Sequence, residues 1–422
     1  MAAGSQQVED LAARCLQSLL AGWDDWTEPA DRLAALATSE ASDDAARAVF
    51  TGIVEPLADR FEPRLVLAYR RFFARLLTRC DWLLPELDQL GLPDDSALLD
   101  RAARIADTAP APLAPQAVRR VIIPSRVTVG ADVALTLRAV GRVLHCCPDA
   151  QVEFWGGRSS ASLLPTDPRV RSRVWDYPRR GGLRARLDAW SRMRESVASL
   201  WDESTWLIDL DTRWSQAGML PLTPNDDRLL FWESRSYRPE SSAPLSQLVD
   251  EWLDEVVGAS SQKPAVAHPR ADLSEVKRPV AVVNFGVGGN EAKRLGDGFE
   301  KAVLETLGAA GYSVLLDQGF GEEERRRTRE LASGGLARLR QTTISELAGL
   351  IAAADLYVGY DSAGGHIAAA LGTRAVDLFA GAVSPRMIDR WSPWGVCPAD
   401  VIAVSDEESP DAVLARLRER LV

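Results

Sequence analysis

A strand–turn–helix–strand pattern near the carboxyl terminus restricts the fold more than any other feature of this sequence. Residues 358–360 favour a buried strand, and residues 363–372 have the Ala-rich composition of a helix. A second apolar segment, residues 375–379, follows this helix directly. Two strands that are joined through a helix are parallel neighbours in one sheet. The chain therefore contains at least one domain in which helices cover a parallel sheet.

The turn between this strand and this helix has the composition of an anion site. It is formed by Asp361, Ser362, Ala363, Gly364, Gly365 and His366. Small side chains allow a ligand to approach the backbone closely, and the free N–H groups and positive end of a helix favour an anion. We therefore predict a phosphate-bearing ligand at the carboxyl edge of the parallel sheet.

The 422 residues divide into three parts, more than one compact domain usually holds. Residues 1–110 show helical periodicity and almost no strand pattern, which predicts an all-α N-terminal domain. A proline-rich linker follows at residues 109–115. Alternating strand and helix patterns then predict two Rossmann-like α/β domains, residues 118–260 and 278–422, which face each other across a cleft.

The motif at residues 361–372 resembles the signature of glycosyltransferase family 9, the heptosyltransferase-like enzymes. The residues that fall on the family pattern are Asp361, Ser362, His366, Ala369, Ala370 and Gly372. The resemblance covers residues 118–395 and implies a GT-B fold whose second α/β domain binds a nucleotide-diphosphate sugar. Within this turn, Asp361 is a candidate for holding the nucleotide ribose or orienting a loop, and His366 is a candidate for contacting a phosphate or capping the helix.

A glycine-rich loop after the first strand of the second α/β domain offers a second phosphate contact. It contains Gly286, Gly288, Gly289, Lys293 and Arg294. The N–H groups of such a loop bind phosphate, and Lys293 or Arg294 is expected to neutralise the diphosphate as it leaves. The family has a similar loop that ends in a Lys-Arg pair. A surface loop whose basic residues contact no ligand is the alternative.

Asp132 is the candidate general base. It follows the first strand of the first α/β domain, where the family has a Gly-Asp run, but here Ala131 is inserted after Gly130 and Arg138 replaces a common proline. An aspartate at the lip of this sheet can remove the proton of an acceptor hydroxyl. Aspartate is also favoured in the first turn of a helix, so a purely capping role stays open.

Together these motifs predict an inverting, metal-independent glycosyltransferase with Asp132 and Lys293 as its catalytic residues. We expect no metal. We also expect no cofactor, because the nucleotide-diphosphate sugar is itself the substrate. Asp209 and Asp211 form an Asp-x-Asp pair of the kind that binds a metal in GT-A enzymes, but the pair resembles a family segment that is not a metal site. One alternative function is a non-catalytic nucleotide-sugar-binding or scaffold protein with a degenerate GT-B fold. A second is a sugar-nucleotide epimerase or hydrolase of GT-B shape, which would need no acceptor.

Composition limits the partners. A net charge of −11 does not favour nucleic acid. The N-terminus lacks a signal pattern and the chain lacks an apolar run that spans a bilayer, so we expect a cytoplasmic protein and keep peripheral contact with the inner face of the membrane open. The acceptor is a glycan, a lipid or a protein. We expect the helical first 110 residues to have one of three roles: to mediate homo-oligomer formation, to bind a partner protein or to shape the acceptor site.

Overall fold

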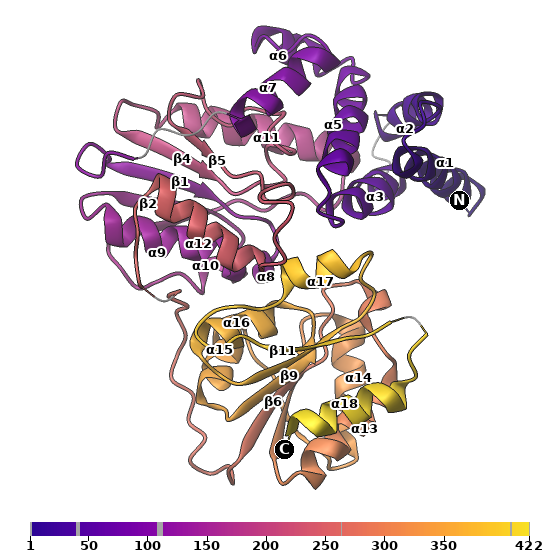
Figure 1. The fold of residues 1–422 in the computed structure, drawn as a ribbon, viewed down its shortest axis with the longest axis vertical. Helices are drawn as coiled ribbons and strands as arrows, with labels where there is room; N and C mark the ends of the chain where they lie inside the picture. Colours follow the sequence, from indigo (N-terminus) through magenta and orange to yellow (C-terminus); the bar gives the residue numbers. More distant parts are fainter. Residues whose placement is uncertain (1, 39–42, 108–112, 263, 406, 422) are drawn as a thin grey trace.

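The computed structural model describes residues 2–38, 43–107, 113–262, 264–405 and 407–421. A helical region is followed by two α/β domains, which lie one above the other in Figure 1 with the helical region beside the upper domain. The expected proline-rich linker lies mostly outside the described residues. No described helix is both long enough and apolar enough to cross a membrane.

The first 107 residues form helices, as their periodicity predicts. In α5 the apolar side chains Leu65, Phe72, Phe73 and Leu76 recur at helical spacing and are buried, whereas Leu67 faces outward. The elements are α1 Ala2–Ala21, α2 Thr27–Thr38, α3 Asp43–Val49, the π-helical turn η1 Phe50–Val54, α4 Glu55–Ala58, α5 Pro63–Thr78, α6 Leu84–Gln89 and α7 Asp95–Asp107.

The first α/β domain contains a five-stranded parallel sheet in the order β3-β2-β1-β4-β5. Its strands are β1 Arg120–Pro124, β2 Gln151–Gly156, β3 Val170–Val174, β4 Thr205–Asp209 and β5 Leu229–Phe231. Its helices are α8 Val129–Ala131, the π-helical turn η2 Asp132–Thr136, α9 Leu137–Cys146, α10 Arg158–Ala161, α11 Gly182–Ala198 and α12 Leu245–Val256. The chain order reverses between β1 and β4, so the loops after these two strands meet at the carboxyl edge.

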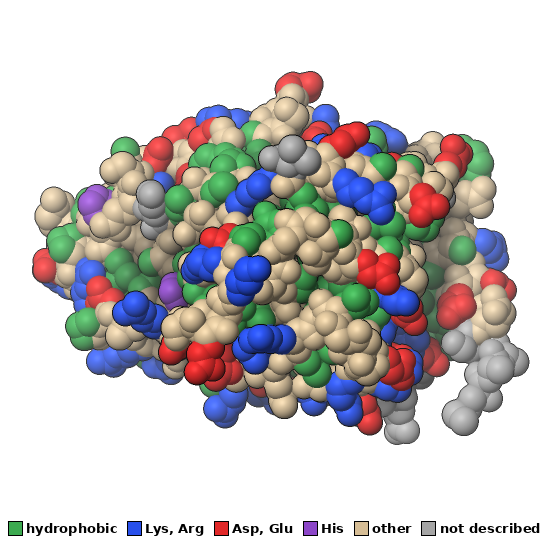
Figure 2. All heavy atoms as spheres, turned by 90° about the horizontal axis from the view of Figure 1, so that it is seen from below, with side chains coloured by type: hydrophobic (Ala, Val, Ile, Leu, Met, Phe, Trp, Pro, Cys, Tyr) green, Lys and Arg blue, Asp and Glu red, His purple; other side chains and the backbone are tan. Residues whose placement is uncertain are grey.

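The second α/β domain contains a six-stranded parallel sheet in the order β11-β10-β9-β6-β7-β8, which reverses between β6 and β9. Its strands are β6 Val280–Asn284, β7 Ser313–Asp317, β8 Arg338–Arg340, β9 Leu356–Tyr360, β10 Ala375–Phe379 and β11 Asp400–Ala403. Its helices are the 3-10 turn η3 Glu291–Lys293, α13 Asp297–Ala309, α14 Glu322–Ser333, α15 Ile344–Ala353, α16 Ala363–Leu371, α17 Pro385–Trp391 and α18 Pro410–Leu421. Figure 2 shows acidic and basic side chains interspersed over the face seen from below, without a single-sign stripe of the kind that binds nucleic acid.

The helical region and the first sheet share one hydrophobic core. Phe72 and Phe73 of α5 belong to the same buried cluster as Ile122, Trp155 and Leu207 from strands β1, β2 and β4. The opposite face of this sheet is covered separately by α9 and α12. The helical region therefore replaces part of the helical layer that usually covers a doubly wound sheet.

Polar contacts fix the helical region to the loop that follows β4. The Tyr69 hydroxyl donates to Gln216 Oε1 at 2.7 Å, and Arg70 Nε donates to the carbonyl of Ala217 at 3.0 Å. Gln216 and Ala217 have φ values of 49° and 55°, a left-handed backbone that non-glycine residues adopt only when their surroundings enforce it. The helical region thus holds one loop of the first domain in a strained conformation.

We predict that Phe73→Ala destabilises the helical region and the first sheet together. Phe73 is fully buried in the shared core, so the cavity should cost about 3–5 kcal/mol of unfolding free energy in urea denaturation followed by tryptophan fluorescence. Leu67→Ala on the same helix, at a position 43% exposed, is the control and should cost less than about 1 kcal/mol. Separate transitions for the helices and the sheet would contradict a shared core.

Candidate functional site

Lys293 and Asp361 meet where the strand order of the second sheet reverses. Lys293 ends the glycine-rich loop after β6, and Asp361 follows β9, the strand beside β6. The Lys293 ammonium forms an ion pair with the Asp361 carboxylate and donates to the Asp361 carbonyl at 3.2 Å. The topology therefore brings together two loops that are almost 70 residues apart, and it places a cation beside the N-terminus of α16.

The first turn of α16 packs tightly on the strands below it. A Cβ atom on Gly364 would lie 2.0 Å from the Tyr357 hydroxyl, and one on Gly365 would lie 2.9 Å from Asp377 Oδ1. The two glycines are therefore required by side chains beneath the helix. This is a different cause from the close approach of a ligand that the sequence predicted. Ser362 makes no capping hydrogen bond, which leaves the first N–H groups of α16 without a side-chain cap.

Asp377 is a buried acid that the sequence analysis missed. It lies on β10 beneath Gly365, and neither carboxylate oxygen has a hydrogen-bond partner within the described ranges. Burial raises the pKa of its carboxyl well above the usual range, and the nearby Asp361 adds to this shift. Burial thus favours the neutral form of the Asp377 carboxyl beside the Lys293–Asp361 ion pair. The signal in the sequence was one acidic residue within an apolar strand.

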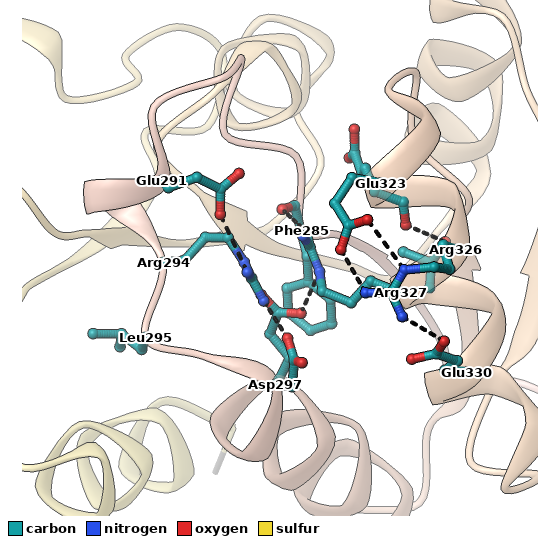
Figure 3. A network of polar contacts seen from close by, with 12 residues as sticks. Phe285, Glu291, Arg294, Leu295, Asp297, Glu323, Arg326, Arg327 and Glu330 are labelled. Atoms are coloured by element: carbon teal, nitrogen blue, oxygen red, sulfur yellow. Dashed lines mark hydrogen bonds and ion pairs between the residues drawn. The ribbon is translucent and has the colours of Figure 1, made fainter. Parts of the chain in front are cut away.

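The two basic residues of the glycine-rich loop differ in how far protein carboxylates already occupy them. Arg294 donates to Glu300 Oε1 at 2.9 Å and also forms ion pairs with Glu291 and Asp297, as Figure 3 shows. These carboxylates raise the pKa of Arg294 and occupy its guanidinium, so Arg294 stabilises the loop rather than offering itself to a phosphate. Lys293 is the cation of this loop that lies beside α16.

The glycines of the loop also differ in what surrounds them. Gly288 and Gly289 have φ values of 62° and 89° and have open space around them. A Cβ atom on Gly286 would instead lie 2.7 Å from Glu324 Oε1 and 2.9 Å from Asn284 Oδ1. Gly288 and Gly289 therefore provide the backbone conformation and the space that a phosphate needs, whereas Gly286 is required by its neighbours.

Asp132 lies under the loop after β1, and both oxygens of its carboxylate accept hydrogen bonds. Oδ2 accepts from Ser125 Oγ at 2.6 Å, and Oδ1 accepts from the Arg126 backbone N–H and from Thr136 Oγ1, each at 2.8 Å. Asp132 is 1% exposed. Burial raises the pKa of this carboxyl, and the hydrogen bond from Ser125 opposes that shift. The sequence left two roles open for Asp132, that of a general base and that of a capping residue. This geometry favours a structural role.

Helices α8 and α16 bring the two α/β domains into direct contact. A Cβ atom on Gly130 would lie 3.4 Å from the Ala363 backbone and 3.5 Å from His366 Cδ2. Arg138, which replaces a proline of the family pattern, donates to the Trp394 carbonyl at 2.7 Å and pairs with Asp250. Arg138 thus links the two domains, which explains why a cation is useful at this position.

Trp391 at the end of α17 is the centre of this junction, and Figure 1 shows α17 at the side of the second domain that faces the first domain. Its ring centroid lies 6.3 Å from that of His366 and 6.4 Å from that of Phe61 in the helical region. The Arg126 guanidinium lies 5.9 Å from the same ring. All three parts of the chain therefore meet at one tryptophan, and the sequence gave no sign that Phe61 would take part.

The Asp-x-Asp segment contributes to packing and ion pairing. Asp209 accepts from the Thr212 backbone N–H at 2.8 Å, and Asp211 accepts from Ser234 Oγ at 2.7 Å and pairs with Arg235. Among the residues that the structure describes, no group of three or more His, Cys, Asp or Glu side chains has the arrangement of a metal site.

We predict that alanine has opposite effects at two helical glycines. Gly364→Ala should destabilise the fold by about 1–3 kcal/mol, because its Cβ would overlap the Tyr357 ring and hydroxyl. Gly298→Ala in α13 meets open space and should stabilise by about 0.5–1 kcal/mol. Thermal or urea unfolding measures both changes. Equal effects at the two positions would show that α16 is not packed as described.

We predict that His366 weakens the fold at low pH. Burial lowers the pKa of His366 to about 4, so the unfolded chain, with a histidine pKa near 6.5, binds the proton more tightly. The Asp361 carboxylate opposes this shift, and the cations Lys293 and Arg138 add to it. His366 should therefore lower the unfolding free energy by about 2 kcal/mol between pH 7.5 and pH 5.

The measurement is urea unfolding at the two pH values. His366→Gln should remove this part of the pH dependence, whereas His268→Gln, at an exposed position, should leave it unchanged. The same pH dependence in the parent and in His366→Gln would contradict a buried, neutral His366.

Comparison with known proteins confirms the family resemblance. Residues 245–413 match the model of glycosyltransferase family 9 (heptosyltransferase). A stretch of 98 residues, 22% of this chain, is 38% identical to lipopolysaccharide heptosyltransferase 3 of Escherichia coli. The aligned stretch spans 28% of the length of that relative.

Two solved structures share the fold of this chain. A family 9 glycosyl transferase from Veillonella parvula superposes with a TM-score of 0.51 at 12% identity, over 74% of this chain and 96% of that one. The E. coli heptosyltransferase WaaC with ADP-2-deoxy-2-fluoro heptose gives a TM-score of 0.51 at 16% identity, over 71% of this chain and 99% of that one. Two Rossmann-like domains in the GT-B arrangement, preceded by a helical region, are thus confirmed.

Proposed function

We propose that this chain, a glycosyltransferase family 9-like protein of GT-B fold, transfers a sugar from a nucleotide-diphosphate sugar to an acceptor hydroxyl. The observation that carries the proposal is the meeting of the Lys293 ammonium with the N-terminus of α16 at the reversal point of the second sheet. A cation beside a helix N-terminus stabilises a diphosphate as it departs. The first domain, in contact across α8, provides the acceptor side.

The donor site uses groups that are now paired with the protein itself. Lys293 pairs with Asp361, and a diphosphate competes with Asp361 for the same ammonium. The N–H groups of Ser362, Ala363 and Gly364 at the start of α16 and the open loop at Gly288 and Gly289 complete the phosphate contacts. Asp361, once released from Lys293, is free to accept from a ribose hydroxyl.

The transfer is an inverting displacement that needs no metal. The acceptor oxygen attacks the anomeric carbon while the bond from that carbon to the diphosphate oxygen breaks. The electron pair leaves with the diphosphate, where Lys293 and the α16 dipole stabilise the charge that a divalent cation carries in other transferases. His366, kept neutral by its low pKa of about 4, acts as a hydrogen-bonding group at this site.

The names of the relatives indicate the substrates to try first. The solved heptosyltransferase contains an ADP-linked fluoro-heptose, so ADP-heptose is the first donor. The curated relative is named for lipopolysaccharide, so a lipopolysaccharide core is the first acceptor. A glycan, another lipid and a protein follow it.

A nucleotide-sugar-binding scaffold is the rival function, and the enclosed Asp132 favours it. A chain without a usable base would bind the donor and release no nucleotide. The test is to supply a donor and an acceptor together. If the nucleotide then stabilises the chain but no donor is turned over, the scaffold function is established and the transferase function is overturned.

We predict that Lys293→Ala abolishes most of the stabilisation by a nucleoside diphosphate. ADP should raise the Tm of the parent by mass action, equally with EDTA and with Mg²⁺, and the variant should lose most of this shift. Turnover of ADP-heptose should fall by about 10²–10³-fold, the usual cost of removing one group that stabilises developing charge.

The control is Lys301→Ala, a lysine on the exposed face of α13 in the same domain. It should keep both the Tm shift and the turnover. A full ADP shift in Lys293→Ala would contradict the donor site, and a shift that requires Mg²⁺ would contradict metal independence.

A further inference from the structure

A buried carboxylate in the second α/β domain connects two arginines that come from different elements. Glu300 lies in the first turn of α13 and is fully buried. Its Oε1 accepts from Arg294 Nε at 2.9 Å, and its Oε2 accepts from Arg327 Nε of α14 at 3.1 Å. Arg294 ends the glycine-rich loop, so one carboxylate joins this loop to two helices. We call these three residues the Glu300 network.

The Glu300 network holds both ends of the glycine-rich loop. The loop begins at Phe285, the residue after β6, and Arg327 Nη2 donates to the Phe285 carbonyl at 3.2 Å. Arg294 fixes the other end through Glu300. Residues 285–294 therefore leave the sheet and return to it at points that are both tied to one buried carboxylate.

The end of this loop is also aligned with the strand that leads to Asp361. The Leu295 backbone N–H donates to the Tyr360 hydroxyl at 3.1 Å, and Tyr360 directly precedes Asp361 in the chain. The partner of Asp361, Lys293, lies two residues before Leu295. The contacts at this end of the loop therefore fix the backbone from which Lys293 reaches the N-terminus of α16.

The middle of the loop has little to fix it. Gly288 and Gly289 are exposed, and a Cβ atom on either would meet open space. Glycine has more backbone freedom than any other residue, so this stretch does not hold itself in one conformation. The Asn290 side chain accepts from the Ala292 N–H at 3.2 Å and forms a local turn beside Lys293. The contacts at the two ends of the loop therefore determine where this turn lies.

The neighbouring Arg326 shows what is special about Arg327. Arg327 is 4% exposed, whereas the Arg326 side chain is 55% exposed and pairs with Glu323 and Glu330 of its own helix, as Figure 3 shows. Exposed pairs within one helix contribute little, but removing one partner of a buried pair leaves an uncompensated charge. Of these two adjacent arginines, only Arg327 thus ties α14 to the glycine-rich loop.

We propose that Glu300 and Arg327 are positioning residues for the donor diphosphate. They act through the glycine-rich loop, which they hold so that Lys293 lies at the N-terminus of α16 before the donor arrives. A loop that is already ordered loses less conformational freedom on binding, so the diphosphate binds more tightly. This inference rests on the proposed donor site.

The test uses two pairs of variants, each with a matched control. Arg327→Lys keeps a positive charge beside Glu300 but loses the planar guanidinium that also reaches the Phe285 carbonyl. Its control is Arg326→Lys at the adjacent exposed position. Glu300→Gln removes the shared carboxylate, and its control is Glu305→Gln at an exposed position of the same helix.

Two measurements at a temperature well below every Tm separate positioning from stability. Hydrogen–deuterium exchange of peptides that cover residues 286–294 should be faster in Arg327→Lys and in Glu300→Gln than in the parent chain and the controls. Calorimetric titration with ADP, UDP and GDP identifies the tightest ligand of the parent. Its affinity should fall by about 10–10²-fold in both variants and stay unchanged in both controls.

A double variant tests whether the residues act as one unit. Arg294→Gln breaks the same network from the side of the loop. If Glu300 acts through Arg294, the loss of nucleotide affinity in Arg294→Gln combined with Glu300→Gln should be close to the loss in Glu300→Gln alone. Losses that simply add would contradict a shared action on the loop.

Two outcomes overturn the inference in different ways. A parent that binds a nucleoside diphosphate, together with variants that have a lower Tm but parental affinity and parental exchange of the loop, would show a merely structural network. The donor site would then still stand. A parent that binds neither ADP, UDP nor GDP would overturn the donor site and this inference together.

Discussion

The packing of the first turn of α16 is the contact on which the rest of the site depends. This turn lies above Tyr357 and Asp377 of its own sheet and below α8 of the first domain. Only glycine fits at positions 364 and 365, so the helix N-terminus is held at one height above the sheet. Its N–H groups and the Lys293–Asp361 pair therefore occupy fixed positions at the boundary of the two domains.

The same boundary explains why the chain carries a helical region. Phe61, Arg126 and His366 converge on Trp391 from the three parts of the chain. Burial at this junction shifts the pKa values of two ionisable groups: it lowers the pKa of His366 and raises that of Asp377. Burial therefore favours the uncharged forms of His366 and Asp377 near the Lys293–Asp361 ion pair, which suits a site that handles a diphosphate.

Local sequence signals predicted the elements of the fold well. The pattern at residues 358–372 corresponds to β9 and α16, and the periodicity at residues 64–78 corresponds to α5. The short strands β5, β8 and β11 were missed, because three or four residues of mixed polarity carry little periodic signal. The motif at residues 361–372 also pointed to the family whose model matches residues 245–413, since its residues are contiguous in sequence.

The site was less predictable because its contacts are long-range. Arg294 and Lys293 are adjacent in sequence, yet three carboxylates occupy Arg294 and only the fold shows this. The role of the glycines in α16 depends on Tyr357 and Asp377, which lie on strands on either side of that helix in the sequence.

The structure of the chain with bound ADP tests the central claim most directly. The account predicts that the diphosphate contacts the Lys293 ammonium and the first N–H groups of α16, and that the ion pair between Lys293 and Asp361 is broken. A nucleotide bound elsewhere, or Lys293 still paired with Asp361 beside the bound nucleotide, would contradict the account.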